Sequence, residues 1–265
     1  EKTIIESIKN NNNIKLLTFS RRFGQSSATM AGLNESHGKY CIVIDVDLQD
    51  PPELIRDLYN KISDGHNFEV VMAKRKTRKG ETLIKKIISS VGYYLINKMT
   101  DIKIPKDTGD FRIMSRRVVD ELKKLNESHG FLRGLVSFVG FKQTFIEYDR
   151  LERHRGSGNY NRYFGSLKIG LNGIFSFTSK PLVIMSTAGF IFALISFLIG
   201  LWYVIQKLIG VDFSPGLPTT VLVITFFSGI QLLGLGLLGE YISRIYDEVK
   251  KRPQYIIDKK INLDK

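Results

Sequence analysis

Cysteine and histidine are both scarce in this sequence of 265 residues. The single cysteine, Cys41, excludes an intramolecular disulfide framework, and its place in an apolar run fits a buried thiol in a reducing compartment. The four histidines are His37, His66, His129 and His154. They lack the spacing that zinc ligands show, so we do not expect a zinc site.

Charge is absent from two long stretches, residues 181–205 and 217–239. In a helix that rises about 1.5 Å per residue, each stretch exceeds the hydrocarbon core of a bilayer, about 30 Å thick. We favour two transmembrane helices over two buried helices of a large soluble core.

Basic residues are more frequent before the first stretch and after the second than in the connector between them. Residues 151–180 contain five basic residues and one acidic residue, whereas the connector 206–216 contains one of each. After the second stretch come Arg244, Lys250, Lys251 and Arg252. Because cytoplasmic loops carry an excess of Lys and Arg, we expect both termini in the cytoplasm and a short hairpin loop outside.

Acidic residues are the minority charge overall: 26 against 39 Lys and Arg, a net charge of +13. This balance predicts an anionic partner, and nucleic acid, a phosphorylated small molecule or an anionic membrane surface would each qualify.

Apolar runs alternate with amphipathic segments in residues 1–180, which is typical of an α/β domain. We expect strands at 14–20, 40–47 and 69–75. Between the last two, Leu54, Leu58 and Ile62 repeat on one helical face, with Asp50 as the expected N-terminal cap and Gly65 at the end.

Three polar residues follow the apolar strand in the run CIVIDVDLQDPPELI: Asp45, Asp47 and Gln49. Alternate residues of an extended chain lie on the same side, and ligands of open α/β sheets bind beyond the carboxyl ends of strands. Carboxylate and amide oxygens suit Mg²⁺ or Mn²⁺, which would bridge a diphosphate. The alternative is a solvated turn, since D-x-D is common by chance.

Five motifs in order resemble those of one enzyme family: IDVDLQDPPELI, RKTRKGE, TGDFRIMSRRVVD, FLRGLVSFVGF and GEYISRIYDEVKKRPQYI. They are similar to the polyprenyl-phosphate glycosyltransferases of the dolichol-phosphate-mannose synthase type, in the bacterial subgroup with two membrane helices. The resemblance implies an α/β fold: a Rossmann-like GT-A domain that binds a nucleotide-sugar, followed by interfacial helices and a two-helix transmembrane hairpin.

The resemblance also implies a reaction. A hexose would pass, with inversion, from a nucleotide diphosphate-sugar to a polyprenyl (undecaprenyl) phosphate at the cytoplasmic face of the bacterial inner membrane. UDP-glucose is our first choice of donor and UDP-N-acetylglucosamine our second. Nucleic acid is not expected as a partner, and a homo-oligomer stays open.

The expected organisation has four parts. Residues 1–162 form the cytoplasmic GT-A domain, 163–180 a juxtamembrane amphipathic helix, 181–240 the transmembrane hairpin and 241–265 a cytoplasmic tail. A plain core helix is the alternative for 163–180. The family's opening strand and its D-D-G-S turn have no counterpart here, so we expect the amino-terminal strands to be missing from the printed chain.

The family's acidic residues and metal ligands map onto four positions. Asp45 resembles the aspartate that faces the nucleotide-sugar and the metal, and Asp47 and Gln49 match the other ligands of Mg²⁺ or Mn²⁺. Asp110 matches the proposed catalytic base. Its alternative role is the N-terminal cap of a helix over 111–125.

The family's basic residues map onto six positions. Those expected to hold the donor diphosphate are Arg75, Arg78 and Lys86, with Lys85 as an alternative to the last. Those expected to hold the acceptor phosphate are Arg133, Arg153 and Arg155. The segment around Arg153 lacks the family's Ser and Lys, so either Arg155 replaces that lysine or the acceptor contact is rearranged.

Two rival functions remain. Processive polysaccharide synthases carry a Q-x-x-R-W motif and more membrane helices, whereas the one tryptophan here, Trp202, lies in an apolar stretch. A membrane-tethered basic scaffold is the rival from another class. The D-x-D carboxylates would repel the phosphate groups of its partner unless a metal were bound. A test separates the enzyme from the scaffold: the enzyme should bind a nucleotide diphosphate in a way that depends on Mg²⁺ or Mn²⁺, and the scaffold need not.

Overall fold

The computed structural model describes residues 2–76, 94, 97–100, 102, 105, 108–125, 127, 132–149, 172–210 and 216–263. The chain divides into two units, which we treat separately. The first combines Glu1–Phe177 with Lys251–Lys265, and the second is Thr178–Lys250.

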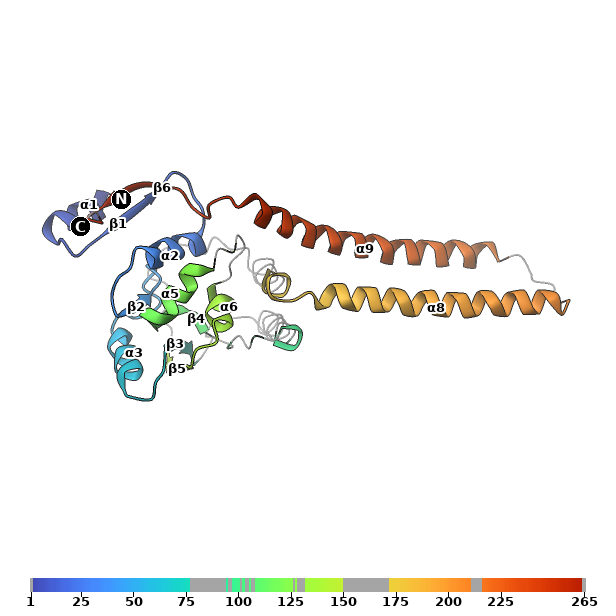
Figure 1. The fold of residues 1–265 in the computed structure, drawn as a ribbon, viewed down its shortest axis with the longest axis horizontal. Helices are drawn as coiled ribbons and strands as arrows, with labels where there is room; N and C mark the ends of the chain where they lie inside the picture. Colours follow the sequence, from blue (N-terminus) through green and yellow to red (C-terminus); the bar gives the residue numbers. More distant parts are fainter. Residues whose placement is uncertain are drawn as a thin grey trace. The chain divides into compact units, whose positions relative to one another are not determined.

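The first unit contains a four-stranded mixed sheet in the order β2-β4-β3-β5 (Figure 1). Its strands are β2 (Tyr40–Val43), β3 (Val70–Arg75), β4 (Thr108–Ser115) and β5 (Gln143–Tyr148). β4 runs antiparallel to both β2 and β3, while β3 and β5 are parallel. The α/β class is therefore confirmed, and the sheet is mixed.

Helices cover both faces of this sheet. Val70 and Met72 of β3 pack with α2 (Gln25–Asn34), α5 (Arg116–Lys124) and α6 (Leu132–Phe138). Val71 and Ala73, the alternate residues of the strand, pack with α3 (Leu54–Ser63) on the opposite face. Since successive side chains of a strand point to opposite faces, burial on both sides explains why the first four residues of β3, 70–73, are apolar.

Helix α3 has the face that its sequence predicts. Leu54, Leu58 and Ile62 are all buried, and Gly65 follows the helix with a φ of +80°, which glycine adopts without strain. The predicted cap is wrong. Glu53 occupies the N-cap position without a side-chain hydrogen bond, and Asp50 accepts a hydrogen bond from a tyrosine hydroxyl instead.

Strand β1 (Leu16–Phe19) follows α1 (Lys2–Asn10) and pairs antiparallel with β6 (Ile257–Ile261), near the other end of the chain. Just before β6, the ring of Tyr255 stacks on Phe19 at 5.4 Å between centroids. Its hydroxyl accepts a hydrogen bond from Asn34 of α2 at 2.7 Å. Residues beyond the second long helix thus form part of the first unit.

The second unit is a pair of long apolar helices, α8 (Lys180–Leu208) and α9 (Leu217–Lys250). Each is long and apolar enough to cross a membrane. Among the described residues, Met185 lies against Gly234 and Phe192 against Phe227, while the Tyr241 hydroxyl donates to the carbonyl of Thr178, two residues before α8. These contacts are seven residues apart along each segment, the spacing of an antiparallel pair with coiled-coil-like packing.

The segment before α8 is described only in part. Residues 172–177 are helical, and Ile174 is buried. Phe177 is partly buried and packs against the core cluster to which α6 contributes. Residues 163–171 of the predicted juxtamembrane helix lie outside the described residues, so its membrane-surface placement and the four-part organisation stay predictions.

Tyr255→Ala should destabilise the first unit, because it removes a stacked ring and a hydrogen bond that tie the carboxyl-terminal segment to α2 and β1. For a partly buried aromatic side chain we expect a loss of roughly 2 kcal/mol, about 5 °C in melting temperature. Thermal unfolding of the purified protein in detergent measures it. Lys259→Ala, at an exposed position of β6, is the control, and equal melting temperatures for the two variants would contradict the packing.

Candidate active site

One edge of the four-stranded sheet gathers the residues that the sequence singles out. The carboxyl ends of β2, β3 and β5 meet there with the beginning of β4. Asp45 lies two residues beyond β2, Arg75 is the last residue of β3, and Asp110 is the third residue of β4. The strand directions therefore bring together residues that are far apart in the chain.

A bulge in β4 contains Asp110. Met72 pairs with Arg112 and Lys74 pairs with Thr108, so Ala73 alone faces three residues of β4, 109–111. Such an irregularity leaves backbone carbonyls without partners in the ladder and re-aims a side chain. Arg112, almost completely buried, compensates for it: its guanidinium donates to the carbonyls of Gly109 at 2.8 Å and Asp110 at 3.3 Å.

A chain of hydrogen bonds links the two catalytic candidates. Arg133 of α6 donates from Nε to Asp110 Oδ1 at 2.8 Å and from Nη2 to Oδ2 at 3.4 Å. Gln25, the first residue of α2, donates to Asp110 Oδ2 at 3.5 Å and to Asp45 Oδ1 at 2.8 Å. Elements from four parts of the sequence therefore converge on one pair of carboxylates.

Asp110 lies among guanidinium groups. Burial raises the pKa of this carboxyl. The positive charges of Arg133, and after it Arg112 and Arg75, lower the pKa by more than burial raises it, so the net pKa lies below the usual range. Arg112 Nη2 is 3.8 Å from Asp110 Oδ1. At neutral pH Asp110 is an anion paired with cations, which makes it a weak proton acceptor.

The predicted geometry of the D-x-D residues is wrong in one respect. β2 ends at Val43, where its pairing with Arg112 of β4 stops, and residues 46–47 form a turn. Asp45 and Asp47 therefore do not share one side of an extended strand. The Asp47 carboxylate instead accepts a hydrogen bond from the backbone N–H of Gln49 at 3.2 Å, which shapes the turn.

These ligands suit a divalent cation only together with a substrate. Among the described residues, no group of three or more acidic, histidine or cysteine side chains could hold a metal by itself. Mg²⁺ typically takes one or two carboxylates and completes its shell with water and substrate phosphates. Asp45, Asp47 and the Gln49 amide match that type of site.

The basic candidates divide into two groups. Arg75 and Arg133 lie around Asp110. Outside the described residues lie Arg78, Lys86, Arg153 and Arg155. The alternative role of Asp110, as a helix cap, is wrong: residues 111–115 belong to β4, and the cap of α5 is Ser115, whose hydroxyl accepts from the Val118 N–H.

Sequence reasoning missed Gln25 and Arg112. A signal for Gln25 was present in the sequence: a glycine, Gly24, directly precedes this polar residue at the start of a helix of small residues. In the structure Gly24 has a φ of +97°, which glycine adopts without strain. Arg112 lies inside the motif TGDFR, but its role depends on the bulge, which no local pattern predicts.

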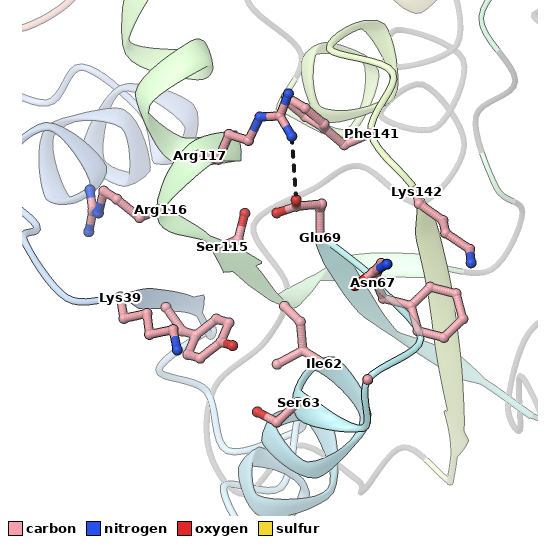
Figure 2. Close-up of a pocket in the computed structure, with 13 residues that line it drawn as sticks. Lys39, Ile62, Ser63, Asn67, Glu69, Ser115, Arg116, Arg117, Phe141 and Lys142 are labelled. Atoms are coloured by element: carbon pink, nitrogen blue, oxygen red, sulfur yellow. Dashed lines mark ion pairs between the residues drawn. The ribbon is translucent and has the colours of Figure 1, made fainter.

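A cavity of about 750 Å³ opens at the opposite edge of the same sheet (Figure 2). Four basic side chains line it: Lys39, Arg116, Arg117 and Lys142. All four have protein partners. Arg117 pairs with Glu69 at 3.8 Å, Arg116 donates to the Gly38 carbonyl and Lys142 donates to the His66 carbonyl. Lys39 Nζ lies over the Tyr40 ring, 5.5 Å from its centroid. None of the predicted site residues that the structure describes lies there, so the candidate active site is the edge with Asp45 and Asp110.

Comparison with known proteins shows the family of the chain. The family described as Glycosyl transferase family 2 matches residues 2–123. The chain is 46% identical over 251 residues to the "Uncharacterized glycosyltransferase YkcC" of Bacillus subtilis, covering 95% of this chain and 77% of that protein.

Two other relatives have more specific names. The "SfII prophage-derived bactoprenol glucosyl transferase" of Shigella flexneri is 42% identical over 243 residues, 92% of this chain and 78% of that protein. The "Prophage bactoprenol glucosyl transferase homolog" of Escherichia coli K12 is 41% identical over 241 residues, 91% of this chain and 78% of that protein. With its α/β domain, its two long apolar helices and this degree of identity, the chain belongs to glycosyltransferase family 2, among the polyprenyl-phosphate glycosyltransferases.

Proposed function

We propose that this chain transfers glucose from UDP-glucose to undecaprenyl phosphate, with inversion at the anomeric carbon. The arrangement of Asp45, Gln25, Asp110 and Arg133 carries the proposal, because it combines carboxylates for a cation with guanidinium groups for phosphates at one sheet edge. The names of the bactoprenol glucosyl transferases support glucose as the sugar and a polyprenyl phosphate as the acceptor.

The location that we propose is the cytoplasmic face of the bacterial inner membrane. Two helices that could span a bilayer support membrane attachment, and the basic residues outside both apolar stretches support cytoplasmic termini. A lipid phosphate held in the headgroup region would then be within reach of a domain on that side. Self-association stays open.

Charge develops on the leaving diphosphate as the bond to the anomeric carbon breaks. Family 2 glycosyltransferases generally use a divalent metal ion, and a cation held by Asp45, Asp47 and Gln49 would neutralise part of that charge. Arg75 would stabilise the same diphosphate, with Arg78 and Lys86 as further candidates. Pre-placed cations of this kind cost no reorganisation when the transition state forms.

Asp110 acts in this proposal as an orienting anion. The acceptor is a phosphate monoester with a second pKa near ~6, so it is already largely ionised at pH 7 and barely requires a base. Asp110 would hold Arg133 in place, and Arg133, with Arg153 and Arg155 as candidates, would hold the acceptor phosphate. The low pKa of Asp110 supports this role over proton abstraction.

The scaffold alternative is set aside because the chain is a glycosyltransferase. A processive synthase is disfavoured by the two candidate membrane spans found among the described residues. UDP-N-acetylglucosamine remains the second choice of donor.

The proposal is tested with a panel of radiolabelled nucleotide sugars. Membranes that contain the protein, undecaprenyl phosphate and Mg²⁺ or Mn²⁺ should yield a labelled lipid with UDP-glucose and little with the other donors. Membranes without the protein are the control. Labelling with UDP-N-acetylglucosamine alone would replace the donor, and no labelled lipid with any donor would overturn the function.

Metal removal should abolish transfer, because the two carboxylates near the diphosphate would otherwise repel it. We expect EDTA to remove activity and Mn²⁺ to restore it. Asp47→Asn should weaken Mn²⁺-dependent binding of UDP by about tenfold, the size of one lost charge-assisted contact. Calorimetry measures the binding without turnover. Asp57→Asn, at an exposed position of α3, is the control, and metal-independent UDP binding would refute the site.

Asp110→Asn should lower turnover by roughly tenfold to a hundredfold, because Arg133 loses its charged partner. Since the pKa of Asp110 is lowered, its carboxylate is ionised from pH 6 to 9 and should add no titration to the turnover of the unmodified protein in that range. The acceptor phosphate barely requires a base, so we expect no rescue of the variant at high pH. Asp120→Asn on α5 is the matched control. Recovery of turnover as the pH rises would show that Asp110 is a base after all.

A further inference from the structure

A buried polar chain lies directly behind the proposed diphosphate ligand Arg75. In the parallel pair of β3 and β5, Arg75 is opposite Tyr148. The Arg75 guanidinium is hydrogen-bonded to the Tyr148 hydroxyl, and this hydroxyl in turn donates to the carboxylate of Asp50. Asp50 and Tyr148 are buried, with 1% and 6% of their surfaces exposed. A buried carboxylate and a guanidinium are thus connected through one tyrosine.

Gly109 fixes the other side of the guanidinium. A Cβ placed on this glycine would lie 3.0 Å from Arg75 Nη2, closer than almost all real contacts of that kind. Gly109 is absent from the residues with positive φ, so its backbone does not need glycine. A side chain at this position would fit only if the Arg75 guanidinium shifted. The guanidinium therefore lies between the Gly109 backbone and Tyr148.

One of the five N–H donors of Arg75 does not help to hold it. Arg75 Nε is buried and has no hydrogen-bond partner in the part of the chain that the structure describes. An arginine side chain has several rotatable bonds, and ordering it for a ligand costs conformational entropy unless the protein has already ordered it. The contacts with Tyr148 and Gly109 restrict the guanidinium, and the charge of Asp110 attracts it.

We propose that Asp50 and Tyr148 are positioning residues that hold the Arg75 guanidinium against Gly109, aimed at the diphosphate of the sugar donor. This inference rests on the proposed function, in which Arg75 binds that diphosphate. Asp50 orients the tyrosine hydroxyl, whose lone pairs then face Arg75. Neither residue needs to touch the substrate.

The tyrosine remains a donor to Asp50 over the whole working range of pH. Burial, and after it the hydrogen bond with Asp50, raise the pKa of Tyr148 to about 12. The negative charge of Asp50 compensates the positive charge of Arg75 through the hydroxyl, and a paired, hydrogen-bonded arrangement is what buried charges require. The arrangement is therefore set before the donor binds.

The test is a double-mutant cycle between Tyr148→Phe and Arg75→Ala. Tyr148→Phe should raise KM for the nucleotide-sugar and weaken Mn²⁺-dependent UDP binding by about tenfold, the effect of one lost hydrogen bond to a charged group. KM for undecaprenyl phosphate should stay within about twofold. In the Arg75→Ala background the second substitution should add little, because a positioning residue has no effect once its target is removed.

Tyr255→Phe is the matched control, since it removes a hydrogen-bonded tyrosine hydroxyl from the same unit at a place outside the site. It should leave both KM values unchanged. Gly109→Ala is the second variant, because it displaces the guanidinium from the opposite side while the bond between Tyr148 and Asp50 stays intact. It should also raise KM for the donor, with a melting temperature near that of the unmodified protein.

The outcomes separate the two proposals. If Arg75→Ala leaves donor KM and UDP binding unchanged, the diphosphate role of Arg75 fails, and the positioning inference fails with it. If Arg75→Ala weakens UDP binding but Tyr148→Phe and Gly109→Ala do not, only the positioning inference is overturned. Additive effects in the cycle, or a Tyr148→Phe variant that loses melting temperature with unchanged KM values, would assign Tyr148 and Asp50 a purely structural role.

Discussion

The ion pair between Arg133 and Asp110 is the contact on which the candidate site depends. It joins α6 to β4, and Gln25 extends it from α2 to Asp45 beyond β2. Three guanidinium groups lower the pKa of this one carboxylate against its burial. We propose that Arg133 and Arg75 bind the phosphates of the acceptor and the donor at this edge, and that Asp45 and Asp47 would hold a cation.

The mixed sheet makes this arrangement possible. Burial on both faces holds β3 and β4 in a fixed register, and within that register the bulge at 109–111 aims Asp110 at the edge. The bulge disrupts the ladder, and the buried guanidinium of Arg112 restores hydrogen bonds to its carbonyls. Arg112 thereby stabilises the backbone of the site. In the neighbouring pair of β3 and β5, Arg75 lies opposite Tyr148, whose hydroxyl donates to Asp50.

Much of the fold could be predicted from local patterns. The face of α3 with Leu54, Leu58 and Ile62 is buried as its period indicates, and the two charge-free stretches form α8 and α9. The prediction for Asp110 as a cap was wrong, because the helical pattern of α5 extends backwards in sequence into β4. Pairing with β2 and β3 overrode that local preference, and Ser115 became the cap.

The strand register and the carboxyl-terminal segment could not be predicted in this way. That β6 pairs with β1, and that Tyr255 stacks on Phe19, depends on contacts between residues more than two hundred positions apart. Asp50 is an example at the site itself: a local reading makes it a cap, whereas the parallel alignment of β3 with β5 places Tyr148 beside it.

Period, charge and motif, which are properties of neighbouring residues, were enough to determine the α/β class, the two apolar helices and the family to which the motifs belong. The tertiary structure alone decided which side chains meet Asp110, that Arg112 supports its bulge and that Gln25 joins it to Asp45. The reason is physical: hydrogen bonds and ion pairs of this kind act over about 3 Å, and only the packing of the sheet brings residues from distant parts of the chain within that range.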